Sequence, residues 1–351
     1  MLTDRDIERY GRQIRLPGFG PEGQEKLARA KVLVVGAGGL GSPVLEYLVA
    51  AGVGSIGIVE YELIDLSNLN RQVLYEEKEI GQPKVIQAAE RLRRTNGNIE
   101  IRPWFEKLRK ENVLEIFSFY DLVVDCTDQF PVRYLMADAS ILLDKPVVYG
   151  AVYQFEGQVT VFNYRGGPTL RCLQPEQPHP MEVPSCAEGG IVGFVAGVIG
   201  CLQAGEVIKI LLGMGDVLSG KLLVYNGLDC SFHSFSLERS TEPDRIKELG
   251  DYPEACLPEG LELKTLTKRE LQQWISEGRP CLVINVSDPS DRYDPGFPSV
   301  HIPSYEIASK LTSLSRDIPI ILACPMGIKS RIVANYLVSR EGYQDVWVLG
   351  L

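Results

Sequence analysis

Four glycines near the start of the chain have the spacing of a phosphate-binding loop. They lie between an apolar run at residues 32–35 and a helical pattern at residues 44–49, and they are Gly36, Gly38, Gly39 and Gly41. Glycines permit a tight turn in which backbone N–H groups approach a phosphate, and the positive end of the following helix favours the anion. Glu60 ends the next strand-like run, and an acid about 20 residues past such a loop can bind a ribose hydroxyl. This order predicts nucleotide binding but no particular reaction, since a dehydrogenase opens in the same way.

A second group of polar side chains could hold phosphates and a metal ion. Asn68 can hydrogen-bond a phosphate, Arg71 can grip one with two donors, and Lys84 offers a point charge. Asp128 follows a strand predicted at residues 120–125, at the end where parallel sheets bind ligands. Its carboxylate suits Mg²⁺ bridged to ATP phosphates. Taken alone, residues 67–72 are also typical of a polar turn before a helix, and Asp128 of a helix N-cap.

Three stretches resemble the MoeB/ThiF/HesA family of adenylating enzymes, which are relatives of ubiquitin-activating enzymes: residues 67–72, 81–84 and 125–128. The resemblance covers about the first 240 residues. It implies an ATP site with Mg²⁺ on Asp128, formed by the four glycines, Glu60, Ser67, Asn68, Arg71, Lys84 and Asp128. It also implies that the substrate is the C-terminal glycine of a small ubiquitin-like sulfur carrier ending in Gly-Gly. The family normally has aspartate where this chain has Glu60, and often asparagine where it has Gln129.

Residues 4–15 predict a short charged helix that contains the sequence R-Y-G-R-Q at residues 9–13. Composition alone favours a solvated helical face. The family carries R-Y-x-R-Q at this place, which implies that Arg12 reaches the nucleotide of the other subunit and neutralises phosphate charge there. The resemblance therefore implies a homodimer in which each active site is shared.

We expect different roles for two cysteines in this part of the chain. Cys186 precedes the apolar segment at residues 191–212, and the family carries a cysteine there that is catalytic in some members and dispensable in others. A thiol near a helix N-terminus is activated, whereas a small buried apolar residue is the alternative. Many members also hold a structural zinc with two C-x-x-C pairs. This chain has no C-x-x-C, and Cys172 is the one thiol left at those positions, so no structural zinc is expected and Cys172 is interpreted as structural.

The last 90 or so residues contain a second candidate site around Cys324. A capping-box pattern from Thr267 predicts a helix, strands are predicted at residues 281–284 and 318–323, and Cys324 follows the second strand. The loop after Cys324 resembles the active-site loop of rhodanese, and residues 300–303 carry the H-I-P of that family. The resemblance implies a thiolate or persulfide held by backbone N–H groups and Lys329. Residues 285–288 lack the charged pair of the family and Pro325 removes a donor, so a binding-only module is the alternative.

The strand and helix order predicts a Rossmann-like, doubly wound sheet. Strands predicted at residues 98–103 and 120–125 alternate with helices, which is typical of parallel pairing, and residues 156–163 continue the sheet antiparallel. We expect an adenylation domain at residues 1–242, a linker at 243–260 and a smaller α/β rhodanese-like domain at 261–351.

Bulk properties exclude several function classes. The net charge is −10 without a dense Lys/Arg run, which argues against a nucleic-acid partner. Gln203, Glu206 and Lys209 interrupt the apolar segment at residues 191–212, so a buried helix is expected and not a membrane span. The charged N-terminus lacks a signal-peptide pattern, and the eight cysteines lack paired spacing, so we expect a cytoplasmic protein.

Together these features predict an ATP-dependent adenylyltransferase that activates a sulfur carrier. Sulfur would then replace AMP, with a persulfide on Cys324 and a cysteine desulfurase as candidate donors. One alternative is an NAD-dependent dehydrogenase, which would leave Arg71, Lys84 and Asp128 without a task. A second alternative is a weakly catalytic scaffold that presents the carrier to other sulfur enzymes.

Overall fold

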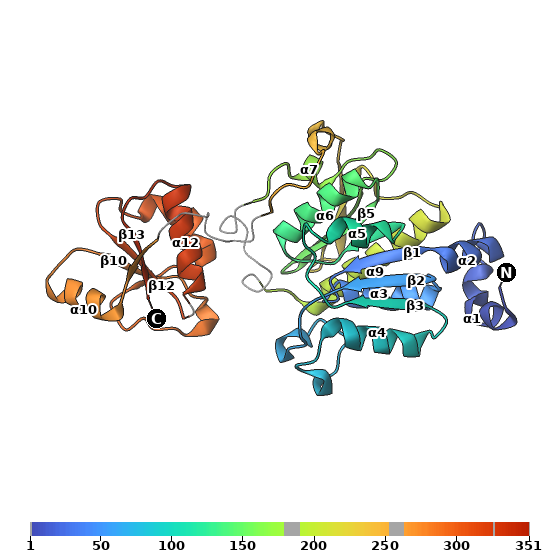
Figure 1. Ribbon diagram of the computed structural model, residues 1–351, viewed down its shortest axis with the longest axis horizontal. Coiled ribbons are helices and arrows are strands. Elements are labelled where there is room, and N and C mark those ends of the chain that lie inside the picture. Colours follow the sequence, from blue (N-terminus) through green and yellow to red (C-terminus); the bar gives the residue numbers. More distant parts are fainter. Residues whose placement is uncertain (1, 179–189, 253–262, 326, 351) are drawn as a thin grey trace. The chain divides into compact units, whose positions relative to one another are not determined.

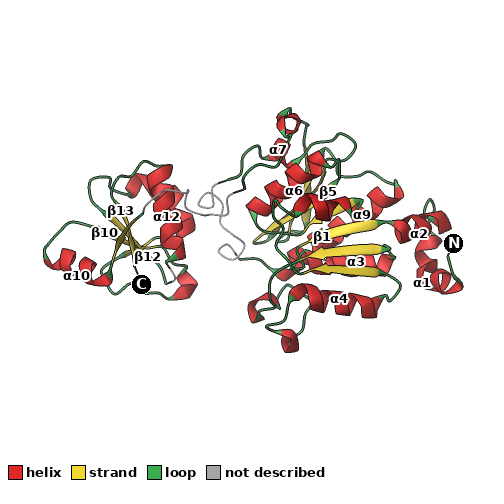
Figure 2. Cartoon of the chain, in the orientation of Figure 1, coloured by secondary structure: helices red, strands yellow, loops and turns green. Residues whose placement is uncertain are grey.

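The computed structural model describes residues 2–178, 190–252, 263–325 and 327–350. Contacts divide the chain into two compact units (Figures 1 and 2). The first unit holds the described residues up to 177 and those from 190 to 252, and the second holds residue 178 and the described residues from 263 onward.

An eight-stranded mixed sheet forms the first unit, with strand order β3-β2-β1-β4-β5-β6-β7-β8. The strands from β3 to β5 in this order pair in parallel, and β6, β7 and β8 follow antiparallel. This arrangement confirms the predicted doubly wound sheet and its antiparallel continuation. The strands are β1 (Lys31–Val35), β2 (Ser55–Val59), β3 (Glu100–Trp104), β4 (Leu122–Asp125), β5 (Val147–Tyr153), β6 (Glu156–Phe162), β7 (Lys221–Asn226) and β8 (Ser231–Ser236).

Helices cover both faces of the parallel part because its strands are apolar on both faces. In β1, Val32 and Val34 pack into one core with α3, α4 and α9, while Leu33 and Val35 pack into the other with α5 and α6. A strand buried on both faces appears in the sequence as a continuous apolar run. The helices are α1 (Asp4–Ile14), α2 (Gly20–Arg29), α3 (Gly41–Ala51), α4 (Lys84–Thr95), α5 (Val113–Ser118), α6 (Phe130–Leu142), α7 (Leu170–Leu173) and α9 (Gly193–Leu212), with 3-10 turns η1 (Leu66–Asn68), η2 (Glu77–Glu79) and η3 (Glu242–Arg245).

Helix α9 is the one helix of the described residues that is long and apolar enough to cross a membrane. It packs instead against α3, β5 and β6. Two polar residues of its buried face, Gln203 and Glu206, are 0% and 4% exposed and are hydrogen-bonded within the unit. The helix therefore belongs to the core of the first unit.

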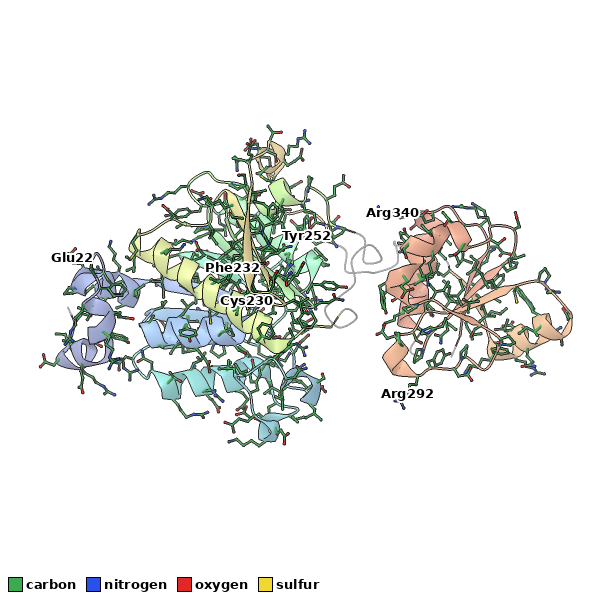
Figure 3. All side chains as sticks on the ribbon, turned by 180° about the vertical axis from the view of Figure 1, so that it is seen from behind. Glu22, Cys230, Phe232, Tyr252, Arg292 and Arg340 are labelled. Carbon is green, nitrogen blue, oxygen red and sulfur yellow. The ribbon has the colours of Figure 1, made fainter. Side chains whose placement is uncertain are left out.

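Residues 243–252, which the sequence places in the linker, pack on the first unit. Leu249 is buried in the same core as α5 and α6. Tyr252 (labelled in Figure 3) donates a hydrogen bond of 2.7 Å from its hydroxyl to Oδ2 of the buried Asp138. The turn-rich, charged composition of this segment conceals these two anchoring side chains, so the predicted linker begins about ten residues too early.

The second unit is a five-stranded, all-parallel sheet with strand order β11-β10-β12-β13-β9. The predicted capping box is confirmed, since the Thr267 and Glu270 side chains each accept the other's backbone N–H at the start of α10. In the central strand, Ile320 and Leu322 face one core and Ile321 and Ala323 the other. The elements are β9 (Lys264–Leu266), α10 (Lys268–Ser276), β10 (Leu282–Asn285), η4 (Pro289–Asp291), β11 (Val300–His301), η5 (Ser304–Glu306), α11 (Ile307–Lys310), η6 (Leu311–Ser313), β12 (Ile320–Ala323), α12 (Ile328–Ser339) and β13 (Val346–Leu349).

Candidate active site

The carboxyl ends of three parallel strands lie level at one edge of the first sheet. Val35 of β1 is in register with Val59 of β2 and with Asp125 of β4. The glycine loop leaves β1, Glu60 follows β2, and the turn that ends in Asp128 follows β4. Parallel pairing therefore brings together three parts of the predicted site that are far apart in the sequence.

The glycine loop depends on close backbone approach at two of its glycines. Gly36 has φ +93°, and a Cβ there would lie 2.7 Å from the carbonyl oxygen of Cys126. A Cβ on Gly41 would lie 2.2 Å from the carbonyl oxygen of Gly36. Both distances are shorter than real contacts of a Cβ atom, so only glycine allows the loop to turn directly into α3.

Glu60 connects the glycine loop to the end of β2. Its Oε2 accepts a 3.1 Å hydrogen bond from the N–H of Ala37, and its Oε1 accepts from the N–H groups of Tyr61 and Glu62 at 2.8 and 2.9 Å. Burial raises the pKa of Glu60 above its ordinary value, and these three donors favour its charged form. The extra methylene of Glu60 thus reaches the loop itself, and its ribose contact stays a prediction.

The predicted phosphate ligands at residues 67–71 lie beside the glycine loop. The Asn68 Oδ1 accepts the N–H of Asp65 at 3.1 Å, which leaves the amide N–H₂ end for another partner. Arg71 donates from Nη1 to the carbonyl of Ser67 at 2.8 Å. The Cγ of Arg71 lies 3.5 Å from the place of a Cβ on Gly39, so the arginine borders the loop.

Gln72 is a residue of this site that the sequence reasoning missed as a functional candidate. It is 5% exposed, and its Oε1 has no hydrogen-bond partner among the described residues. Its Nε2 lies 3.4 Å from the place of a Cβ on Gly38. The only sequence signal was its position directly after Arg71.

Lys84 has a counter-ion that the sequence reasoning also missed. The Lys84 side chain is 2% exposed, and its Nζ lies 2.5 Å from Oε2 of Glu62. The backbone N–H of Lys84 donates to the carbonyl of Glu62 at 3.0 Å, which fixes the start of α4 beside β2. The signal was a second acid two residues after Glu60.

Asp128 is exposed and has no hydrogen bond or ion pair with the rest of the described chain. Helix α6 begins at Phe130 with Gln129 as its N-cap residue, so the interpretation of Asp128 as an N-cap is wrong. The described residues contain no group of three His, Cys, Asp or Glu side chains that could hold a metal ion. A single unpaired carboxylate fits Mg²⁺ that takes its other ligands from nucleotide phosphates and water.

Arg12 lies at the opposite edge of its own sheet. Its neighbour Gln13 donates from Nε2 to the carbonyl of Ala51 at 2.7 Å, and Ala51 is the last residue of α3, whose first residue is Gly41. The eleven residues of α3 separate the two edges by about 15 Å. Figure 1 shows α1 and α2 together at this end of the first unit. The structure therefore does not bring Arg12 to the glycine loop of its own chain.

Cys324 directly follows β12 and is 3% exposed. Its sulfur accepts the N–H of Ser330 at 3.3 Å, and Gly327, the N-cap residue of α12, has φ +69°. The Nζ of Lys329 lies 2.5 Å from Oδ2 of Asp288, so its charge has a carboxylate partner. Among the described residues, the N–H of Ser330 is the one backbone donor to the sulfur, and the predicted ring of loop donors stays a prediction.

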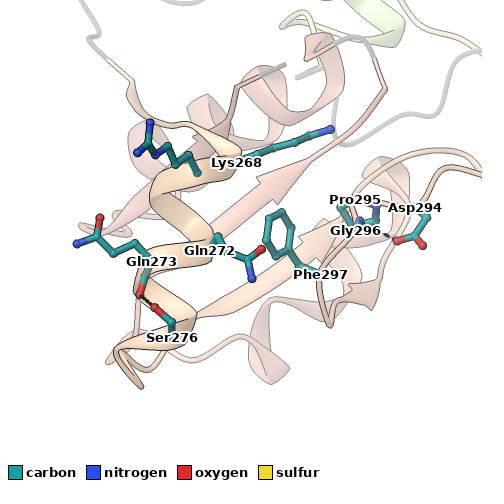
Figure 4. A pocket seen from close by; sticks show the side chains of 9 residues that line it. Lys268, Gln272, Gln273, Ser276, Asp294, Pro295, Gly296 and Phe297 are labelled. Carbon is teal, nitrogen blue, oxygen red and sulfur yellow. Dashed lines mark hydrogen bonds between the residues drawn. The ribbon is translucent and has the colours of Figure 1, made fainter.

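A pocket of about 690 Å³ lies elsewhere on the second unit, between α10 and residues 294–297 (Figure 4). Lys268 and Arg269 are among the residues that line it, and Phe297 faces Gln272 across it. None of the predicted site residues lines this pocket.

Comparison with protein-family models decides the family. The model of the ThiF family matches residues 10–245. This chain belongs to the ThiF family. The chain is 49% identical to the sulfur carrier protein adenylyltransferase of Thermus thermophilus, over 72% of this chain and 98% of that protein. It is 38% identical to the adenylyltransferase and sulfurtransferase MOCS3 of Drosophila sechellia, over 97% of this chain and 80% of that protein.

Solved structures support the fold of this ThiF-family chain. A crystal structure of E. coli MccB with succinimide has a TM-score of 0.61 at 21% identity, covering 71% of this chain and 75% of that one. A crystal structure of E. coli MccB with ATP has a TM-score of 0.56 at 20% identity, covering 65% and 68%.

Two segments where the resemblance implies zinc-binding pairs in many family members are linked here by hydrogen bonds to one sulfur. The Sγ of Cys172 accepts the N–H of Thr169 at 3.3 Å and that of Ser240 at 3.4 Å. Burial acts to raise the pKa of Cys172, but these hydrogen bonds outweigh it and the pKa lies below its usual value. A tetrahedral zinc site needs four ligands, so the single thiol of Cys172 does not fit a structural zinc. Cys186 lies outside the described residues, and its role stays a prediction.

The first prediction is that purified protein contains far less than one zinc per chain, because one thiol replaces a four-thiolate site. Elemental mass spectrometry measures the metal content, and a thermal unfolding scan with and without a chelator should give the same Tm. One tightly held zinc per chain, or a Tm lowered by the chelator, would contradict this interpretation.

Proposed function

We propose that this chain uses ATP to adenylate the C-terminal carboxylate of a small sulfur carrier, and then takes part in its conversion to a thiocarboxylate. The observation that carries the proposal is that the glycine loop, Glu60 and the Asp128 turn follow strand ends that are in register at one edge of the sheet. Arg71 lies beside the loop, and Lys84 lies at the start of α4 beside β2. The named activities of relatives that match 72% and 97% of the chain support it.

In the first step a carboxylate oxygen of the carrier attacks the α-phosphorus of ATP. The bond between the α-phosphorus and its bridging oxygen breaks, and pyrophosphate leaves. The loop N–H groups, Arg71 and Lys84 hold the phosphates and balance the charge that develops, so catalysis is positioning and electrostatic stabilisation. Mg²⁺ held by Asp128 would add charge neutralisation at the phosphates. The pair of Lys84 with Glu62 implies that the phosphates compete with this carboxylate for the ammonium group.

Arg12 completes the site of a second copy of the chain in this proposal. The helix that carries Arg12 is separated from the glycine loop of the same chain by the length of α3, about 15 Å. Action of Arg12 on phosphate therefore requires a homodimer that places α1 of one protomer over the glycine loop of its partner. The exposed guanidinium of Arg12 then contributes one positive charge to a site that otherwise has Arg71 and Lys84.

The second step replaces AMP by sulfur, and we assign this sulfur to Cys324. A cysteine desulfurase would load the thiol as a persulfide, and the terminal sulfur would attack the carrier's acyl carbon with AMP as the leaving group. The product is an acyl disulfide between the carrier and Cys324. A second thiol, acting as the reductant, would attack the Cys324 sulfur, form a new disulfide with it and release the carrier thiocarboxylate. The N–H of Ser330 and the start of α12 stabilise negative charge on the sulfur. The carrier is taken to end in Gly-Gly, as the resemblance to the family implies.

Alanine at Arg71, Lys84 or Asp128 should lower ATP–pyrophosphate exchange, measured with a purified carrier, by roughly 10²-fold or more, the scale of a lost preorganised charge contact. Arg109→Ala changes an exposed arginine outside the site and serves as the control. Near-normal exchange in all three variants, or binding of NAD in preference to ATP with Mg²⁺, would overturn the adenylation proposal.

Mixed dimers test the shared site. Arg12→Ala and Asp128→Ala should each exchange pyrophosphate far more slowly alone, yet mixing the two should restore part of the exchange activity, because a heterodimer keeps one site free of both changes. Native mass spectrometry confirms that heterodimers form. Heterodimers without any regained activity would show that Arg12 does not act across the dimer.

Cys324→Ser should keep pyrophosphate exchange but abolish persulfide formation, because the two reactions use separate units. Mass spectrometry after incubation with a cysteine desulfurase and cysteine, or with thiosulfate, detects the added sulfur. Cys281→Ser changes a partly buried thiol of the same unit and is the matched control. An unmodified Cys324 under both donors, with thiocarboxylated carrier still formed, would reduce this unit to a docking module.

A further inference from the structure

The turn that carries Asp128 is irregular backbone and needs outside support to hold one conformation. Its own contacts are local, since Oδ1 of Asp125 accepts from the N–H of Thr127 at 2.9 Å and from its hydroxyl at 2.7 Å. Asp125 is 2% exposed, whereas Asp128, three residues on, is exposed. The turn therefore has a fixed inner end and an outer end whose direction other residues must set.

Arg133 of α6 holds the turn from one face of the sheet. It is 7% exposed, and its Nη2 donates to the carbonyl of Thr127 at 2.5 Å and to the carbonyl of Gly150 in β5 at 2.9 Å. The same guanidinium places Nε 3.5 Å from Oδ2 of Asp125. A planar fork of donors thus connects both ends of the turn to the neighbouring strand.

Gln203 of α9 holds the same turn from the other face. It is fully buried, and its Nε2 donates to the carbonyl of Asp125 at 2.7 Å and to the carbonyl of Val148 in β5 at 3.3 Å. A Cβ on Gly150 would lie 2.4 Å from Cδ of this glutamine, so β5 has a glycine where the amide crosses it. The long apolar helix therefore uses one of its few polar residues for this contact.

We propose that Gln203 and Arg133 are positioning residues that fix the Asp128 turn from both faces and so aim its carboxylate at the Mg²⁺ of bound ATP. The inference rests on the proposed function. Gln203 contacts the carbonyls of Asp125 and Val148 and, through Oε1, the thiol of Cys126. The contacts of Arg133 include Asp125, the carbonyl of Thr127 and β5, so both residues act directly on residues 125–127 of the turn. A displacement of about 1 Å in such a group can cost about 10²-fold in rate.

Gln203→Met keeps the side-chain volume and removes both donors, and Arg133→Lys keeps the charge and removes the fork. The affinity for α,β-methylene ATP is measured by calorimetry, first without Mg²⁺ and then with saturating Mg²⁺. Without Mg²⁺, we expect the affinity of each variant for the ATP analogue to stay within about twofold of that of the unmodified chain. The factor by which Mg²⁺ increases this affinity should fall by about tenfold. In pyrophosphate exchange kcat should fall more than KM rises.

The matched control is Gln24→Met. Gln24 is also fully buried and also donates from Nε2 to a backbone carbonyl, that of Ala51 at 3.1 Å, but at the opposite edge of the sheet. It should lower the Tm about as much as Gln203→Met while leaving the gain from Mg²⁺ unchanged. If Gln203→Met does not fold, Gln203→Asn replaces it in the same measurements. Its side chain is one methylene shorter and cannot reach the carbonyls of both Asp125 and Val148.

A double-mutant cycle separates positioning from a merely structural role. In an Asp128→Asn background, Gln203→Met should cause no further loss of the Mg²⁺ effect, because the carboxylate that it positions is already gone. Additive losses, or an unchanged Mg²⁺ effect in both single variants, would overturn the inference. Absence of any Mg²⁺ effect in the unmodified chain would overturn the proposed function itself, together with this inference.

Discussion

The parallel register of β1 with β2 and β4 is the constraint on which the candidate site depends. It sets Val35, Val59 and Asp125 level, so the next residues of three separate strands leave the sheet at one edge. Backbone N–H groups at the start of α3 and the acids that follow β2 and β4 then share that edge. A shift of one residue in either pairing would move Glu60 or Asp128 along the strand direction by about 3.3 Å relative to the loop.

Charged groups at this edge are held by other groups before any ligand binds. Glu60 is bound by three backbone N–H groups, Lys84 by Glu62, and Arg133 by Asp125 and two carbonyls. Buried charges require such partners. Asp128 and the amide end of Asn68 differ from them, because the described residues leave these groups exposed or without a partner. The same edge thus combines an inner layer of paired charged groups with an outer layer whose Asp128 carboxylate is exposed.

Local patterns in the sequence were sufficient for the fold of the first unit and for the positions of the glycine loop and Glu60 at one end of its sheet. The apolar run, glycine spacing and following acid predicted β1, the loop and Glu60, because each depends on a few neighbouring residues. Glu62, Gln72, Gln203 and the packing of Tyr252 were missed because their partners lie far away in the sequence. Arg12 was proposed only through family resemblance, since its helix alone is a charged surface helix.

The most direct test of the account follows the α-phosphate of ATP. The protein is incubated with a small sulfur carrier ending in Gly-Gly and with ATP radiolabelled either at the α- or at the γ-phosphorus. The account predicts that label from the α-position appears on the carrier as AMP, and that blocking the carrier's C-terminal carboxylate as an amide abolishes it. Label arriving only from the γ-position, or no label while the protein binds both ATP and carrier, would contradict adenylation of the carrier.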